Sequence, residues 1–447
     1  MTKKTARGAA LAVLNRVGAG GAYANLALAE VLARSPLDAR DRAFCTELVY
    51  GTLRHRARLD YLLGLLVVRP LHRLPPPVLN LLRLSAYQLE VRPDDAPYAA
   101  VDEAVDLAKS EGYPGFAGLC NAVLRGFLRR RASLLLPGPD DPLGLLTITL
   151  SHPVWLAERW LARLGQAEAA DLAAADNEPA PVTLRVNTLR VSRESLLASL
   201  GEAGIKAEPA AFAPEGIRLA AGRAVESLPG FGEGHFTAQD EGAMLAGHAL
   251  GAKGGEFLLD LCAAPGGKAT HLAALGGDQA RIVALDDHPH KVELIRKNCR
   301  RLRLTSVTAA TADAREYRPD ESADGVLLDT PCTGTGVLRR RPDLRWRRAP
   351  GDLRKLCVLQ RELLQNAAAM VRPGGRLVYC TCSLEPEENE EQIRWFLQSF
   401  TDYSPARLEP HLPPAARALC GSDPWLHLWP HRTGTDGFFI CRMEKRR

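Results

Sequence analysis

Two features that this 447-residue sequence lacks limit the protein classes to which it can belong. Its ten cysteines include no Cys-x-x-Cys pair, so the usual spacing of zinc ligands is missing and we expect no metal. The cysteines are scattered along a long chain, which argues against a secreted disulfide framework and favours reduced thiols in the cytoplasm. No run approaches the roughly 20 consecutive apolar residues of a membrane-spanning helix, so no membrane partner is expected.

What is present is ordinary for a globular protein. Hydrophobic residues make up 46% and charged residues 24% of the chain. The formal net charge of +5 permits nucleic-acid binding without requiring it. At roughly 100–200 residues per domain, the length predicts two to four domains.

The first 140 residues read as an all-helical domain, since apolar residues recur there at spacings of three and four. Turn-forming residues at 137–142 then indicate a linker, and a small α+β connecting domain is expected over 150–240. It combines helices at Trp155–Leu164, Ala167–Ala175 and Arg193–Ala203 with strands at Val182–Val186 and Gly216–Leu219. In the N-terminal domain the predicted helices are Ala9–Val17, Tyr23–Ala33, Asp38–Leu66, Val78–Gln88, Ala99–Lys109 and Phe116–Arg130.

The pattern changes from residue 241 to the end, where short apolar runs alternate with amphipathic helical segments. This alternation predicts an α/β domain built on a parallel, Rossmann-like sheet. The expected strands are Phe257–Leu261, Ile282–Leu285, Val307–Ala310, Gly325–Leu328 and Arg376–Tyr379.

A turn rich in small residues follows the first of these strands and opens a helix near Lys268. Such a turn lets the backbone approach a ligand, and a helix N-terminus favours anionic groups. Asp286 ends the second strand, where a carboxylate can accept hydrogen bonds from both ribose hydroxyls of a nucleoside. Asp313 follows the third strand and is placed to reach an adenine amino group. The three features together predict a nucleoside-containing cofactor.

Two other phosphate-binding motifs fit this turn less well. The P-loop spacing G-x-x-x-x-G-K-[ST] is absent. A dinucleotide cofactor remains an alternative, but the turn contains Pro265 and lacks the G-x-G-x-x-G spacing.

Two cysteines follow the fourth and fifth strands, Cys332 in Asp329–Gly336 and Cys382 in Tyr379–Ser383. Both should therefore lie at the cofactor edge of the sheet. Thiols there suit methylation of cytosine C5, because a thiolate that adds to C6 makes C5 nucleophilic. A protonated Asp329 would stabilise the adduct at N3. We expect Cys380 to face the opposite way from Cys382 and to be structural.

Three motifs in this order, Asp260–Lys268, Asp329–Gly336 and Thr381–Ser383, resemble those of the RNA 5-methylcytosine methyltransferase family called Sun or Fmu. The resemblance implies S-adenosylmethionine as cofactor, Cys382 as the nucleophile, Cys332 in product release and a role for Lys268 in the reaction. By the same resemblance, the cofactor contacts are Cys262, Ala263, Ala264, Pro265, Gly266, Gly267, Lys268, Asp286, Asp313 and Asp329.

The resemblance extends over nearly the whole chain. Segments Asp41–Gly51, Tyr98–Val105 and Asn121–Arg125 are similar to a NusB-like RNA-binding domain. Asp436–Phe439 looks like the closing strand of the family. An N-terminal NusB-like domain is typical of the bacterial RsmB-like subfamily, which implies methylation of a cytosine in small-subunit ribosomal RNA. We expect the protein to be a monomer.

An arginine-rich run, 339–348, follows the Cys332 loop and predicts RNA contacts. Arginine pairs with phosphate and an aromatic ring stacks on a base. The alternative is an ordinary solvated face. The residues expected to touch RNA are Arg339, Arg340, Arg341, Arg345 and Trp346.

Two other functions compete with this interpretation. An amino-group methyltransferase normally carries Asp/Asn-Pro-Pro-aromatic after the fourth strand, but Asp329-Thr-Pro-Cys332 has a thiol in place of the aromatic residue. A non-catalytic RNA-binding or assembly factor would need no paired cysteines, and Cys332 with Cys382 argues against it.

Overall fold

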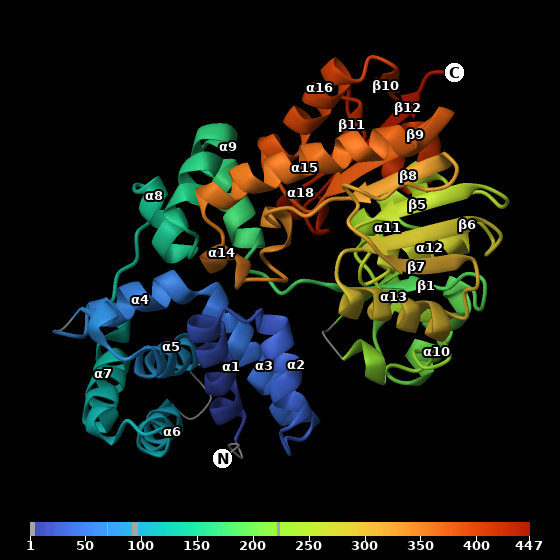
Figure 1. Cartoon of the computed structure of the whole chain (residues 1–447). Helices are drawn as coiled ribbons and strands as arrows, with labels where there is room; N and C mark the ends of the chain where they lie inside the picture. The colour runs from blue at the N-terminus through green and yellow to red at the C-terminus, as the bar shows by residue number, and fades with distance from the viewer. Residues whose placement is uncertain (1–4, 69, 92–96, 221–223) are drawn as a thin grey trace. The chain divides into compact units, whose positions relative to one another are not determined.

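A computed structural model describes residues 5–68, 70–91, 97–220 and 224–447 (Figure 1). The chain forms two compact units. The first comprises Met1–Pro179 together with Leu338–Arg347, and the second comprises Ala180–Val337 together with Arg348–Arg447. In the described part of the chain, no helix is both long enough and apolar enough to cross a membrane.

The first unit is helical, and its core is built from apolar faces of the helices that the sequence pattern predicts. Thr5 and Asp38 cap α1 and α3 by accepting hydrogen bonds from the backbone N–H groups of Gly8 and Asp41. The principal N-terminal helices are α1 (Ala6–Gly20), α2 (Ala24–Ala33), α3 (Ala39–Arg54), α4 (Arg56–Gly64), α5 (Pro76–Val91), α6 (Pro97–Ser110) and α7 (Ala117–Arg130).

The predicted single helix Asp38–Leu66 is wrong, because His55 separates α3 from α4 with φ −100° and ψ 17°. A new helix start leaves backbone N–H groups without partners inside the helix. Here the hydroxyl of Ser151 accepts the N–H of Ala57 at 3.0 Å. A hydroxyl distant in the sequence thus satisfies the N–H group at the break between the helices. Local apolar periodicity cannot reveal such a partner.

The rest of the first unit contains α8 (Pro142–Gly144), α9 (Val154–Ala175) and α14 (Leu344–Arg347). Gly165 has φ 77° and ψ 174° inside α9, so this helix is two segments, as the sequence predicts. The domain boundaries predicted at 140, 150 and 240 stay predictions.

The second unit contains a small antiparallel sheet and a large sheet. The small sheet has the order β2-β3-β1-β4 and packs on α10 (Arg193–Glu202). Two of its strands, β1 and β3, are those predicted from the sequence, whereas the three-residue strands β2 and β4 are too short to show alternation. The strands are β1 (Val182–Val186), β2 (Ala207–Pro209), β3 (Gly216–Leu219) and β4 (Phe236–Ala238).

The large sheet runs in the order β10-β12-β9-β8-β5-β6-β7, with β11 paired to β12. The pairs from β9 to β7 are parallel, and β12 is antiparallel to β9. The chain order reverses beside β5, and ligands bind at such a switch point in open α/β sheets. The strands are β5 (Phe257–Leu261), β6 (Arg281–Asp286), β7 (Val307–Thr311), β8 (Ala323–Asp329), β9 (Val371–Thr381), β10 (Tyr403–Pro405), β11 (Trp425–Leu428) and β12 (Phe438–Lys445).

Alternate strand residues build a core on each face of this sheet, as pleating requires. On one face, Leu258 and Ile282 pack with α11 (Glu241–Leu250), α12 (Gly267–Leu275) and α13 (Pro289–Leu302). On the other, the neighbouring residue Leu259 packs with α15 (Pro350–Met370) and α16 (Glu390–Ser399). The helices lie on both faces (Figure 1), which leaves the carboxyl ends of the parallel strands as the edge available for chemistry.

Candidate active site

The turn between β5 and α12 brings the backbone close to neighbouring elements. Cys262 has a positive φ of 63°, and Gly266 has a φ of 96°. A Cβ at position 266 would be crowded, because it would lie only 3.2 Å from the Cα of Ile295. Glycine avoids both the strain and the crowding at position 266. The predicted loop residues Ala263, Ala264 and Pro265 belong to this turn, and Gly267 is the first residue of α12.

A cavity of about 310 Å³ lies at the strand ends, lined in part by Cys262, Asp286 and Asp313. Cys262 follows β5, Asp286 ends β6 and Asp313 follows β7, so three sequence-predicted cofactor residues meet in one space. Asp286 is 6% exposed and its carboxylate lies 3.2 Å from the ammonium of Lys291. The Arg315 guanidinium beside Asp313 lowers the pKa of that carboxyl, so Asp313 is an anionic hydrogen-bond acceptor at neutral pH.

Lys268 and Asp329, from α12 and the end of β8, form an ion pair in which Nζ lies 2.5 Å from Oδ2. Burial opposes the charge on Lys268, but the adjacent Asp329 carboxylate outweighs it and raises the lysine pKa. Asp260 lies nearby with no exposed surface, and burial raises its pKa to about 8. The Lys268–Asp329 pair therefore carries a proton that can be shared with a ligand. The neighbouring Asp260 carboxyl stays neutral at pH 7.

The two predicted catalytic cysteines are in contact, with Sγ of Cys332 3.3 Å from Sγ of Cys382. The hydrogen bond to Cys382, burial and the charges of Glu388 and Asp329 raise the pKa of Cys332 well above its usual range. Cys332 therefore keeps its proton and can donate it toward the other sulfur.

Glu388, which the sequence analysis missed, holds the Cys332 loop in place. Its carboxylate accepts the backbone N–H of Thr333 at 2.9 Å, the hydroxyl of Thr333, and the amide of Gln360 at 3.0 Å. Burial raises the pKa of this carboxyl. The acidic start of the segment after Cys382 was the only sequence signal, and it does not distinguish a buried acid from an exposed one.

Two glycines let the motif after Cys332 approach the C-terminal strand. A Cβ on Gly336 would lie 2.3 Å from the carbonyl oxygen of Gly437. The N–H of Gly336 donates to the carbonyl of Cys382 at 2.9 Å, and the N–H of Gly437 donates to the carbonyl of Gly336 at 2.7 Å. The backbone hydrogen bond between Gly336 and Cys382 thus ties the two cysteine motifs together.

The predicted orientation of Cys380 is wrong. Residues two apart on a strand point to the same side, and Cys380 and Cys382 contact the same apolar cluster. Cys380 has no exposed surface, and its thiol lies 3.6 Å from Oδ1 of Asp329. It therefore supports the carboxylate at the site rather than facing away from it.

The predicted RNA contact of Arg345 is also corrected. This side chain is 1% exposed, and its guanidinium donates within the first unit to the carbonyls of Ser151 and Asp176, among others. The indole of Trp346 donates to the carbonyl of Leu53 in the same unit. Buried carbonyls of this kind need partners, so Arg345 is structural and cannot reach a phosphate.

The other arginines of the run have different surroundings. Arg339 is buried at 5% exposure, whereas Arg340 and Arg341 are partly exposed. Arg348 donates to the carbonyls of Thr333 and Cys332 and so braces the cysteine loop. RNA contact by Arg339, Arg340, Arg341 and Trp346 stays a prediction.

Family models match three parts of the chain. Residues 248–444 match the model for 16S rRNA methyltransferase RsmB/F. Residues 4–129 match the NusB family, and residues 152–226 match the ferredoxin-like domain of RsmF/B-like methyltransferases.

Relatives match over the full length. "Probable ribosomal RNA small subunit methyltransferase B" of Bacillus subtilis is 38% identical over 100% of both chains. Ribosomal RNA small subunit methyltransferase B of Sodalis glossinidius is 38% identical over 92% of both. Among solved structures, PH0851 is 29% identical with a TM-score of 0.84 over 99% of both chains. A methyltransferase homologue from Pyrococcus horikoshii is 31% identical with a TM-score of 0.59, over 69% of this chain and 100% of its own. The chain therefore belongs to the RsmB/F family of ribosomal RNA methyltransferases, with a NusB domain at its N-terminus.

Proposed function

We propose that this protein transfers a methyl group from S-adenosylmethionine to C5 of a cytosine in small-subunit ribosomal RNA, through a covalent bond between Cys382 and C6. The observation that carries the proposal is the 3.3 Å contact between the Cys332 and Cys382 sulfurs beside the Lys268–Asp329 ion pair. The names of the full-length relatives support ribosomal RNA as the substrate. Action as a cytoplasmic monomer stays a prediction.

The side chains that line the cavity at the strand ends suit the functional groups of S-adenosylmethionine. The carboxylate of Asp286 suits the ribose hydroxyls, Asp313 suits the adenine amino group, and the turn containing Cys262 suits close backbone contact. Bound there, the cofactor supplies an electrophilic methyl group carried on a sulfonium.

Cys382 begins the reaction on the base. Its thiolate donates an electron pair to C6 of cytosine, and the C5–C6 π electrons move into the ring, which makes C5 nucleophilic. The developing charge at N3 is met by the proton that Lys268 and Asp329 share. Attack in this geometry requires an unstacked base, so a single-stranded or flipped cytosine is expected.

C5 next forms a bond to the methyl carbon, and the bond from that carbon to the sulfonium sulfur breaks. Cys332 then releases the product. Hydrogen bonding to Cys382 and the charge of its sulfur raise the pKa of Cys332 in the free protein. Both effects end once Cys382 is bonded to carbon, whereas burial and the charges of Glu388 and Asp329 still favour the protonated thiol. Cys332 therefore first gives its proton to water, and its thiolate then takes the C5 proton. The electrons of the C5–H bond re-form the C5–C6 double bond, and the S–C6 bond breaks to return the Cys382 thiolate.

Bisulfite sequencing of ribosomal RNA tests this proposal in cells with and without the gene. One small-subunit cytosine should be protected from conversion only when the gene is present, and a Cys382→Ala copy should not restore protection. Identical maps in the two strains would overturn the assignment to C5. Methylation of an exocyclic amino group instead would move the protein to the competing amino-methyltransferase class.

A further inference from the structure

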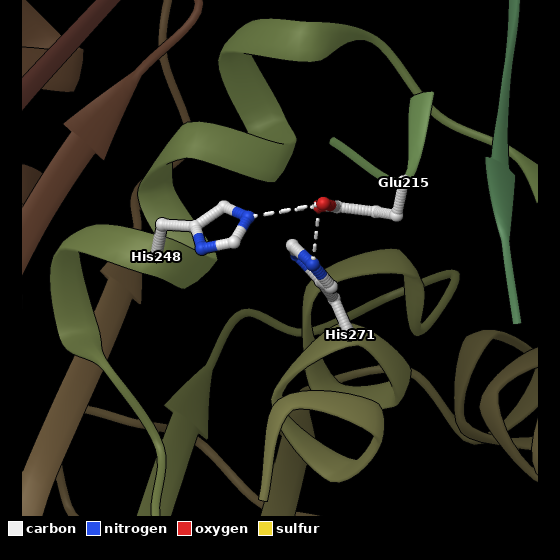
Figure 2. A group of neighbouring side chains, drawn as sticks. All are labelled: Glu215, His248 and His271. Atoms are coloured by element: carbon white, nitrogen blue, oxygen red, sulfur yellow. Dashed lines mark hydrogen bonds and ion pairs between the residues drawn. The ribbon is translucent and has the colours of Figure 1, made fainter. Parts of the chain in front are cut away.

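A second cluster of chemically active side chains lies away from the thiols, where Glu215, His248 and His271 converge (Figure 2). Glu215 immediately precedes β3 of the small sheet, His248 lies on α11 and His271 on α12. Figure 2 shows both imidazoles directed at the carboxylate end of the glutamate. Nε2 of His248 and Nε2 of His271 lie 3.0 Å and 2.8 Å from the same oxygen, Oε1.

Hydrogen bonding accounts for His248, whose Nε2 lies 3.0 and 3.2 Å from the two carboxylate oxygens of Glu215, but not for His271. His271 is 1% exposed, yet neither of its ring nitrogens makes an aligned hydrogen bond, despite the 2.8 Å approach to Glu215. Buried polar atoms normally have partners, and an unsatisfied one is unfavourable. Glu215 is itself 6% exposed, and a buried carboxylate is normally paired with a cation. Among the described neighbours, two imidazoles rather than a lysine or arginine meet its oxygens.

We propose that Glu215, His248 and His271 bind one Zn²⁺ ion. Two imidazole nitrogens and a carboxylate are a common zinc ligand set, completed by a water in the fourth position. Zinc bonds of about 2.0–2.2 Å in a tetrahedron place neighbouring ligand atoms about 3.3–3.5 Å apart. The observed 2.8 and 3.0 Å need an expansion of only a few tenths of an ångström. His248 is the most exposed of the three, with 15% of its side chain accessible, which leaves access for the ion and the water.

The ligand chemistry selects zinc over hard cations. Mg²⁺ and Ca²⁺ prefer sites made of oxygen atoms, whereas imidazole suits zinc. The absence of a Cys-x-x-Cys pair, which led to the expectation of no metal, does not bear on a site made of histidine and glutamate. The sequence offered no spacing signal, because the three ligands come from separate elements.

The ion would join the small sheet to the methyltransferase helices. It would link the residue before β3 to α11 and to α12, whose first turn follows the cofactor loop. The two helices already approach closely at this point, since a Cβ on Gly247 would lie 2.4 Å from Nδ1 of His271. Zinc would therefore stabilise the helix that carries Lys268, without contacting substrate or cofactor.

The test measures bound metal and does not depend on activity. The full-length protein, stripped with a chelator, is titrated with Zn²⁺ against a coloured competing chelator, and its metal content is measured after gel filtration. The native chain should bind one more Zn²⁺ per chain than Glu215→Gln or His248→Gln. Since even outer-shell changes weaken zinc sites by about 10–100-fold, loss of a ligand should weaken this site at least about 100-fold. Mg²⁺ should not compete.

A matched control is His427→Gln. His427 also lies against a glutamate, with Nε2 3.2 Å from Glu390, but the described residues contain no three-ligand group around that pair. This variant should bind Zn²⁺ as the native chain does. Co²⁺ should give the visible bands of a four-coordinate site in the native and His427→Gln proteins only. The proposal is overturned if the stripped native chain takes up no Zn²⁺, or if folded Glu215→Gln and His248→Gln proteins both bind as much as it does.

Discussion

The sulfur of Cys332 lies 3.3 Å from that of Cys382, although 50 residues separate them along the chain. They meet because β8 and β9 are parallel neighbours, so that the segments after both strands leave the same edge of the sheet. Glu388 anchors the backbone of one segment, and the hydrogen bond from Gly336 to the Cys382 carbonyl joins it to the other. This pairing leads to distinct roles for two residues of the same type.

Cys382→Ala should abolish methylation while leaving cofactor binding intact. Losing a nucleophile removes the covalent route, so incorporation of labelled methyl into ribosomal RNA should fall by at least about 1,000-fold. The dissociation constant for S-adenosylmethionine, measured by calorimetry, should change by less than about threefold. Cys420→Ala, which removes another partly buried thiol, is the control and should keep its activity. Normal turnover by the Cys382 variant would refute the nucleophile assignment.

Cys332→Ala should trap a covalent complex between protein and RNA. Attack by Cys382 and methyl transfer remain possible in this variant, but the thiol that removes the C5 proton is gone. Incubation with labelled RNA and S-adenosylmethionine should give a slowly migrating band on a denaturing gel. The double variant Cys332→Ala/Cys382→Ala should give none. A band that survives in the double variant would show that another residue bonds to the RNA.

Asp286→Asn should weaken binding of S-adenosylmethionine about 10–100-fold. A hydrogen bond to a charged group contributes about 1.5–3 kcal/mol, and the buried carboxylate of Asp286 is positioned to accept from the ribose. Calorimetric titration gives the dissociation constant. The neighbouring Asp287, which is exposed, provides the control Asp287→Asn, expected to lose less affinity. Equal losses in the two variants would contradict the assignment of the ribose contact to Asp286.

Asp260 should make the folded protein less stable as pH rises. Burial raises its pKa in the folded state to about 8, whereas an unfolded aspartate titrates near ~3.9. Below pH ~4 both states are protonated. Between ~4 and ~8 only the unfolded state ionises, which favours unfolding by about 1.4 kcal/mol per pH unit. Above ~8 both states are ionised and this contribution to the slope ends.

Urea unfolding of Asp260→Asn at several pH values measures this contribution. As pH rises from 4 to 8, the free energy of unfolding of the variant should increase relative to that of the native protein. The exposed Asp320→Asn should follow the native curve. Parallel curves for Asp260→Asn and the native protein would show that Asp260 is ionised when folded.

Arg345→Met should destabilise the helical unit by about 3–5 kcal/mol. The substitution removes buried hydrogen bonds and one of the positive charges that interact with the fully buried Asp176. Thermal and urea unfolding followed by circular dichroism measure the loss. Arg125→Met, which removes an exposed arginine that donates locally to Asn121, should change stability by less than about 0.5 kcal/mol. A loss of stability below about 0.5 kcal/mol for Arg345→Met would instead indicate that Arg345 is a solvated surface arginine.

Periodicity in the sequence was enough to predict most helices and the parallel strands, because local apolar spacing reflects which face of an element is buried. It also placed Asp286, Asp313, Cys332 and Cys382 correctly at strand ends. The carboxyl ends of parallel strands share one edge, so order along the chain alone predicted that these residues would be neighbours. The motif resemblance then added the roles that spacing cannot assign.

Only the tertiary structure decided which of these groups touch. The contact between two sulfurs, the burial of Arg345 and the position of Cys380 against Asp329 depend on residues distant in the chain. The same holds for the convergence of Glu215 and two histidines, because three separate elements supply them. Local patterns report burial and direction within one element, whereas distances between side chains are set by how the elements pack.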